Sequence, residues 1–296
     1  SGGDLFETAA GIEVLSSPMA GTDRYFSRSA GTSLSTPLVT SMAAEILKFY
    51  PGLLVQTVKA IMLNTTEMSC GKKPAIFNDT SLKGVLKKLT GFGSPVEENL
   101  LMTNENAVTF IIEDNIDLEE VKTIDIRIPK RLLKDKNKLS FISTLCYSFN
   151  PIRENFLNYC PLQIVFGFFR PSTAAVLANE KAENYIIKRG LSWSEDTWAP
   201  EGRFYCNVQQ QDFYLHQQNL ESIGHKVTLG IKCTGKKEIG INHRELLEAG
   251  SHPFSLVVTI AEVPESNVSG ELYNQIIAMN RVQNIISTDI DLDLNI

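Results

Sequence analysis

The stretch GTSLSTP, at residues 31–37, decides how the first part of this chain is interpreted. It leads directly into a run from Leu38 to Tyr50 in which apolar residues recur at helical spacing. A glycine permits a tight turn, and a serine at a helix start presents its hydroxyl beside unpaired backbone N–H groups and the positive end of the helix dipole. Ser33 is therefore suited to act as a nucleophile, and its own N–H can stabilise an oxyanion.

A structural role is the alternative for the same residues. Serine and threonine are common helix caps, because their side-chain oxygens accept hydrogen bonds from the first N–H groups of a helix. Ser33, Ser35 or Thr36 can therefore be an N-cap and nothing more. The pattern predicts a helix that is opened by these hydroxyl residues, carries Pro37 in its first turn and ends before Pro51.

Composition and charge indicate which classes of protein this chain can belong to. With 296 residues, 43% hydrophobic and 21% charged, the chain has the size and make-up of a soluble globular protein of two domains. The net charge of −6 argues against a nucleic-acid or anionic-membrane partner, and no apolar run reaches the length of a spanning helix. We therefore expect neither partner.

The cysteines indicate a reducing compartment. Five are present, an odd number, widely spaced and without a C-x-x-C pair: Cys70, Cys146, Cys160, Cys206 and Cys233. Free thiols in the cytoplasm are expected, with one or two disulfides as the alternative. A targeting signal upstream of Ser1 would change this expectation. No cofactor and no metal site are predicted.

The pattern of apolar residues changes near residue 103, from helical spacing to the alternation typical of strands. Before it, helical patterns cover 38–50 and 54–63, after a short strand at 12–15 and a loop at 16–28. After it, strand patterns dominate, with helical insertions at 173–188 and 271–282. We therefore predict two domains, 1–102 and 103–296, and expect the second to be soluble on its own. The expected strands are 107–112, 122–128, 139–149, 162–169, 203–208, 227–233 and 255–263.

The string GTSLSTP resembles the active-serine segment of the subtilisin-like serine proteases, the subtilases, in which G-T-S-x-[AS]-[ST]-P precedes a helix. A match by chance is on the order of 10⁻⁴ for a chain of this length. The flanks also resemble the family: DLFETAAGIEVLSS at 4–17, VKAIMLNTT at 58–66, and Gly91-Phe92-Gly93 at the start of a strand. Departures at Ala10 and at 38–41 lie at packing positions.

The resemblance implies an α/β fold, the C-terminal part of a doubly wound parallel sheet, followed by an all-β sandwich or jelly-roll module. It implies a serine endopeptidase in which Ser33 is the catalytic nucleophile and a protein or peptide is the substrate. The family's aspartate, histidine and oxyanion asparagine all precede the serine, and residues 1–32 contain no histidine. An upstream segment or a second chain would have to supply them, and residues 1–296 alone are expected to be inactive.

Two alternatives remain open. The order Ser33, Asp196, His216 matches that of α/β-hydrolases, but those enzymes need a G-x-S-x-G turn that this chain lacks. The histidines at 216, 225, 243 and 252 are otherwise expected in loops, at the surface or, for His252-Pro253, in an extended turn. The other alternative is a non-catalytic interaction or regulatory module derived from a subtilase.

Overall fold

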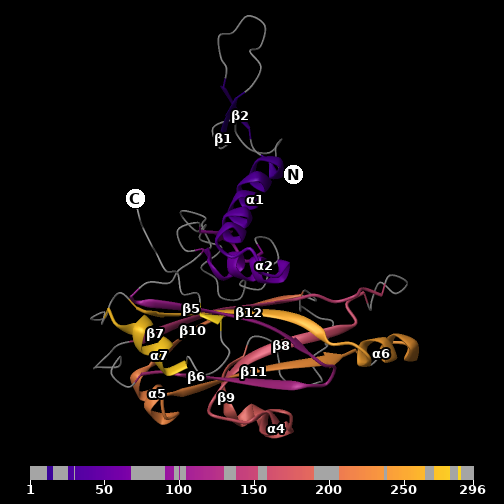
Figure 1. Ribbon diagram of the computed structural model, residues 1–296, viewed down its shortest axis with the longest axis vertical. Helices are drawn as coiled ribbons and strands as arrows, with labels where there is room; N and C mark the ends of the chain where they lie inside the picture. Colours follow the sequence, from indigo (N-terminus) through magenta and orange to yellow (C-terminus); the bar gives the residue numbers. More distant parts are fainter. Residues whose placement is uncertain are drawn as a thin grey trace, which may run out of the picture. The chain divides into compact units, whose positions relative to one another are not determined.

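The computed structural model describes residues 12–15, 26–29, 31–67, 91–96, 100, 105–129, 138–152, 159–189, 207–236, 239–263, 270–280 and 286–287. The chain divides into two compact units, Ser1–Pro51 and Gly52–Ile296. The helices and strands are labelled in Figure 1.

The first unit holds a hairpin and a long helix. Strands β1 (Ile12–Leu15) and β2 (Phe26–Ser29) pair antiparallel, and α1 spans Thr32–Phe49. The strand at 12–15 is confirmed. The loop predicted at 16–28 is wrong for its last three residues, Phe26 to Arg28, because they belong to β2 and pair with β1. The predicted helix is confirmed, but it begins six residues before Leu38, so Pro37 lies inside it.

Most of the second unit consists of two antiparallel sheets. The first has the strand order β10-β7-β12-β5-β13 and the second has the order β6-β11-β8-β9. In chain order the strands are β5 (Ala107–Ile116), β6 (Val121–Arg127), β7 (Lys138–Tyr147), β8 (Leu162–Phe169), β9 (Ile186–Arg189), β10 (Val208–His216), β11 (Lys226–Gly235), β12 (His252–Glu262) and β13 (Ile286–Ser287).

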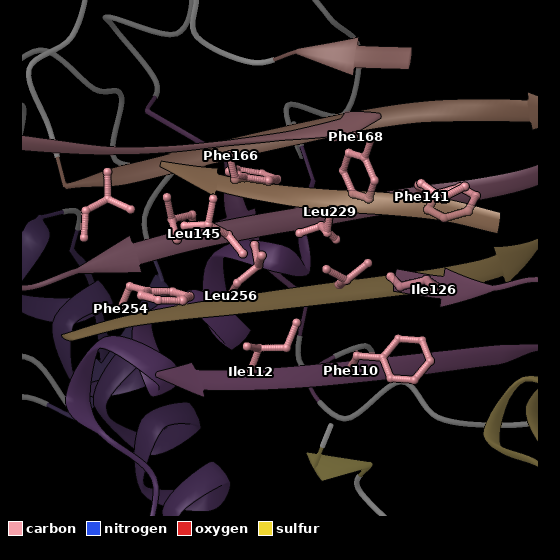
Figure 2. Close-up of a cluster of buried hydrophobic side chains, with 14 of the residues drawn as sticks. Phe110, Ile112, Ile126, Phe141, Leu145, Phe166, Phe168, Leu229, Phe254 and Leu256 are labelled. Carbon is pink, nitrogen blue, oxygen red and sulfur yellow. The ribbon is translucent and has the colours of Figure 1, made fainter. Parts of the chain in front are cut away.

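The two sheets pack face to face over one apolar core (Figure 2). Alternate residues of each strand point inward, as expected for strands with one face in the core. Phe141 and Phe213 of the first sheet contact Phe168 of the second at ring-centroid distances of 5.8 and 4.8 Å. The β-rich module predicted after residue 103 is therefore present. The other labelled core residues in Figure 2 are Phe110, Ile112, Ile126, Leu145, Phe166, Leu229, Phe254 and Leu256.

The connections carry short helices. Those of the second unit are α2 (Val55–Asn64), α4 (Ala174–Leu177), the 3-10 helix η8 (Glu180–Tyr185), α5 (Gln217–Ser222), α6 (Ile241–Glu248) and α7 (Leu272–Asn280). The helices predicted at 54–63 and 271–282 are confirmed. The helix predicted at 173–188 is wrong, because after four α-helical residues the chain turns into η8 and then pairs as β9 with β8.

Helix α2 covers the outer face of the first sheet, where it packs on β12 and β7; Figure 1 shows it beside β12. Thr57 contacts Ser255 of β12 with 2.6 Å between the hydroxyl oxygens, and Asn64 donates to Thr259 at 2.9 Å. Because of this packing, the division between the compact units falls at Pro51, well before the predicted boundary at 102. The domain boundary at 102 stays a prediction.

All strand pairs among the described residues are antiparallel, including the short pair β3 (Thr66–Glu67) with β4 (Ser94–Pro95). The structure thus combines helices with antiparallel sheets. The doubly wound parallel sheet that the family resemblance implies is not seen in these residues.

Candidate functional site

Ser33 is the second residue of α1 and is exposed. Gly31 is the N-cap, with extended backbone angles, and the N–H of Leu34 donates to its carbonyl at 3.0 Å. The backbone N–H of Ser33 therefore belongs to the first turn, where N–H groups have no partner within the helix. A partial positive charge of the helix dipole is concentrated at the same place.

The hydroxyl groups near Ser33 do not cap α1. No side-chain capping bond is formed at Gly31. The Thr36 hydroxyl donates back to the Thr32 carbonyl at 2.8 Å, and Ser35 reaches the carbonyls of Gly31 and Thr32 at a longer 3.4 Å. No hydrogen bond joins the Ser33 hydroxyl to any described residue. The N-cap alternative is therefore wrong for all three residues.

Pro37 affects the backbone at Ser33. In a regular helix the N–H of residue 37 would donate to the carbonyl of residue 33, but proline has no N–H. The structure places Pro37 in the interior of α1, so the Ser33 carbonyl receives no hydrogen bond from it. A proline in the interior of a helix lowers its stability.

The four histidines all lie in the second unit. His216 is exposed at the end of β10, His225 follows α5 with φ at 58°, and His243 is in α6. The expectation for His252 is wrong, because it begins β12 and is buried. Burial lowers the pKa of His252, against the opposing effects of the Leu247 carbonyl at 3.2 Å and of Asp117. Asp196 lies outside the described residues.

The described cysteines are buried and unbridged: Cys146, Cys160 and Cys233. Burial, followed by the nearby carboxylates of Glu119, Glu120 and Asp117, raises the pKa of Cys233 to about 12. Its thiol is therefore protonated at neutral pH and is no nucleophile. Cys70 and Cys206 lie outside the described residues.

The residues that follow α2 and those that follow Gly91-Phe92-Gly93 pair in one small sheet, β3 with β4. Thr66 of β3 pairs with Pro95 of β4, directly after the segment Gly91-Phe92-Gly93. Both glycines have positive φ, at 64° and 103°, a region that other L-residues rarely adopt. The two flanks that resemble the subtilase family, at 58–66 and 91–93, are thus neighbours in the fold.

Two further observations concern the part of the chain that the structure describes. Its His, Cys, Asp and Glu side chains form no group of three that could hold a metal ion. None of its helices combines the length and apolar character that a membrane span requires.

Comparison with known proteins gives three findings. The subtilase family matches residues 2–94. The uncharacterized protein y4bN of Sinorhizobium fredii is 25% identical over 251 residues, which is 82% of this chain and 55% of that protein. The chain thus spans about half the length of this relative. The crystal structure of the infectious bursal disease virus VP2 subviral particle shows 10% identity over 57% of this chain and 36% of that one, with a TM-score of 0.27.

The family match includes Ser33, α1 and α2, and it ends at Ser94, the first residue of β4. It covers all four segments whose residues resemble the family pattern, at 4–17, 31–37, 58–66 and 91–93. Residues 2–94, with Ser33 among them, are therefore similar to the subtilase family.

Proposed function

We propose that this chain supplies the nucleophile of a subtilisin-like serine endopeptidase. The observation that carries the proposal is the exposed Ser33 at the first turn of α1, within the segment that matches the subtilase family. The substrate is a protein or peptide. The proposal includes a parallel-sheet catalytic domain that ends near residue 102, followed by an accessory β-sandwich.

In the reaction, the Ser33 oxygen attacks the scissile carbonyl carbon and gives its proton to a histidine. The N–H of Ser33 donates to the oxyanion of the tetrahedral intermediate. The C–N bond then breaks, the amine leaves with the proton from the histidine, and an ester with Ser33 remains. Water hydrolyses the ester, which releases the carboxylic acid and restores the serine hydroxyl.

The histidine, its aspartate and an oxyanion asparagine come from outside residues 1–296, from an upstream segment or a second chain. Without them the nucleophile has no base, so residues 1–296 alone are expected to show at most residual activity.

The test uses the product of the complete reading frame, its Ser33→Ala variant, and Ser35→Ala as a matched control. We expect a fluorophosphonate probe to label the wild type and Ser35→Ala stoichiometrically and to leave Ser33→Ala unlabelled. Casein hydrolysis should be about six orders of magnitude slower in Ser33→Ala, which is the size of the loss in kcat when the triad serine of subtilisin is removed. Melting temperatures should agree, because the Ser33 hydroxyl has no hydrogen-bond partner among the described residues.

Continued hydrolysis by Ser33→Ala would exclude Ser33 as the nucleophile. A wild type that neither labels nor cleaves would favour the alternative function, a non-catalytic module that retains a subtilase segment.

A further inference from the structure

Helix α2 is held on the first sheet by hydrogen bonds near both of its ends. Near its start, the Thr57 hydroxyl contacts the Ser255 hydroxyl at 2.6 Å. Near its end, the Asn64 amide donates to Thr259 at 2.9 Å, and its oxygen accepts from Thr144 at 3.0 Å. These partners belong to β7 and β12, far from α2 in sequence. The contact therefore joins two distant segments, as the two sides of a protein–protein interface are joined.

An apolar contact lies between the two polar ones. Ile61 is four residues after Thr57 and three before Asn64, so the three side chains share one face of the helix. On β12, Val257 lies midway between the residues that Thr57 and Asn64 contact, and it points to the same side of the sheet. Ile61 therefore faces Val257, and both are buried. An apolar centre with hydrogen bonds around it is the usual anatomy of a protein interface.

Side chains of the sheet also bond to both ends of α2. Its N-cap residue, Leu54, makes no side-chain capping bond. The Glu113 carboxylate of β5 accepts instead from the Leu54 N–H at 2.9 Å and from the Thr57 hydroxyl. At the other end, the Gln210 amide of β10 donates to the Leu63 carbonyl at 2.6 Å. The sheet thus bonds to backbone groups at the helix ends, which have no regular helical partner.

These contacts are specific to a helix of this length and sequence. Helix α2 has ten residues, and helices shorter than about 12 residues are marginal in water without other support. The sheet supplies that support, because its caps lie at both ends and its hydroxyls meet polar side chains two turns apart. A shifted or rotated helix would lose these bonds. The surface therefore recognises one segment, rather than apolar helices in general.

We propose that the outer face of the first sheet is a docking surface that binds the α2 segment as it would bind a separate chain. The subtilase segment, residues 2–94, contains α2, and the β module consists of strands β5 to β13. These two parts therefore remain one noncovalent complex when the chain is cut between β4 and β5. Processing at this point would leave the β module attached. The association does not depend on the activity of Ser33.

The experiment uses the product of the complete reading frame, with a recognition sequence for a site-specific protease inserted between Met102 and Thr103. After cleavage, size-exclusion chromatography over a dilution series measures whether the two fragments elute together. The variants are Thr57→Ala, Asn64→Ala and the double substitution. Val55→Ala is the matched control on the same helix, because Val55 is 84% exposed.

We expect the cleaved wild type and cleaved Val55→Ala to elute as one complex. Thr57→Ala and Asn64→Ala each remove a buried hydrogen-bonding group, so each should weaken the association about 10-fold and the double variant should weaken it about 100-fold. The uncut double variant should still melt cooperatively, because the intact chain keeps α2 at a high effective concentration near the sheet.

Separation of the wild-type fragments on cleavage would overturn the proposal. A cleaved double variant that associates as tightly as cleaved Val55→Ala would do the same, because contacts other than those of α2 would then hold the fragments together. Should the uncut double variant fail to melt cooperatively, cleaved Asn64→Ala decides, and an association equal to that of Val55→Ala would again overturn the proposal. None of these outcomes changes the labelling of Ser33, so the proposed function stands or falls separately.

Discussion

Asn64 illustrates how much of this fold depends on single buried polar residues. It is 5% exposed at the end of α2, and both groups of its side-chain amide are hydrogen-bonded to threonines of the sheet. Asparagine is a poor helix former, so local preference does not account for it. The donor and the acceptor are both needed because Thr144 and Thr259 lie beside it in the apolar surroundings of α2, where an unpaired hydroxyl costs free energy.

Cys233 gives a prediction about pH. Its pKa is raised to about 12 from a model-compound value of 9.0, chiefly by burial. Below pH 9 the thiol is protonated in both states, so its contribution to the free energy of unfolding is fully present. As the pH rises above 9, the unfolded chain loses the proton and the folded protein keeps it, so stability falls by ~1.4 kcal/mol per pH unit until the folded pKa is reached.

We therefore expect the wild type to lose more stability between pH 9 and pH 10.5 than Cys233→Ala does, as measured by urea unfolding at a series of pH values. Below pH 8 the alanine variant should be offset by a constant amount for its lost packing. Parallel curves for the two proteins at high pH would show that the thiol is not protected by burial.

At the scale of the element, strand β10 closes one side of the β module. Gln209 and Gln211 point toward the second sheet and donate to the carbonyls of Ile164 and Phe166 in β8, at 2.6 and 2.8 Å. The β9 strand pairs with β8 only from Gly167 onward. The two glutamines thus satisfy backbone carbonyls of β8 at positions that β9 does not reach, and they do so from the other sheet.

Gln211→Glu tests this role. The carboxylate cannot donate to the Phe166 carbonyl and is a charge in a buried place, since Gln211 is 3% exposed. We expect a loss of about 3 kcal/mol in the free energy of unfolding at pH 7. Burial favours the protonated form, which can donate again, so part of the loss should be recovered as the pH falls toward 4.

Asp212→Asn, an exposed change on the same strand, should be nearly neutral in the same urea titrations. A Gln211→Glu variant as stable as this control, with no pH dependence, would contradict the assignment.

These strands also show what the sequence could and could not predict. Alternation of apolar residues located β5, β7, β8, β11 and β12, because their inward faces form the core. It did not predict most of β10 (Val208–His216), because three glutamines in a row mask the alternation; residues 203–206 of the strand expected at 203–208 lie outside the described residues. The role of the glutamines depends on partners in β8 and α2, which no local pattern contains. The string at 31–37 located Ser33, but Glu113 gave no signal, because its partners Leu54 and Thr57 are distant in sequence.

At the scale of the molecule, family and packing divide the chain differently. The subtilase family matches residues 2–94, whereas the compact units meet at Pro51. By sequence, helix α2 belongs to the segment that matches the subtilase family. By packing, it belongs to the second compact unit, Gly52–Ile296. Part of the segment that matches the subtilase family is thus packed on the β module through α2.

This sharing changes the expectation that residues 103–296 are soluble on their own. Without α2, the outer face of the first sheet loses its cover, and residues such as Val257, 1% exposed, meet water. The hydroxyls of Ser255 and Thr144 also lose their hydrogen bonds to α2, and Thr259 loses its bond to Asn64 and keeps the one to Thr109. We expect fragment 105–296 to self-associate and bind a hydrophobic dye, and fragment 52–296, which retains α2, to be monomeric with a single cooperative melting transition.

Sedimentation velocity and calorimetry on the two fragments decide between these outcomes. A third fragment, 52–296 with Asn64→Ala, serves as a graded control: it keeps the apolar cover of α2 but removes the amide that pairs with Thr144 and Thr259, so it should stay monomeric and melt a few degrees lower. If 105–296 were instead monomeric and as stable as 52–296, the packing of α2 and its hydrogen bonds to Ser255, Thr259 and Thr144 would contribute nothing to the stability of the β module.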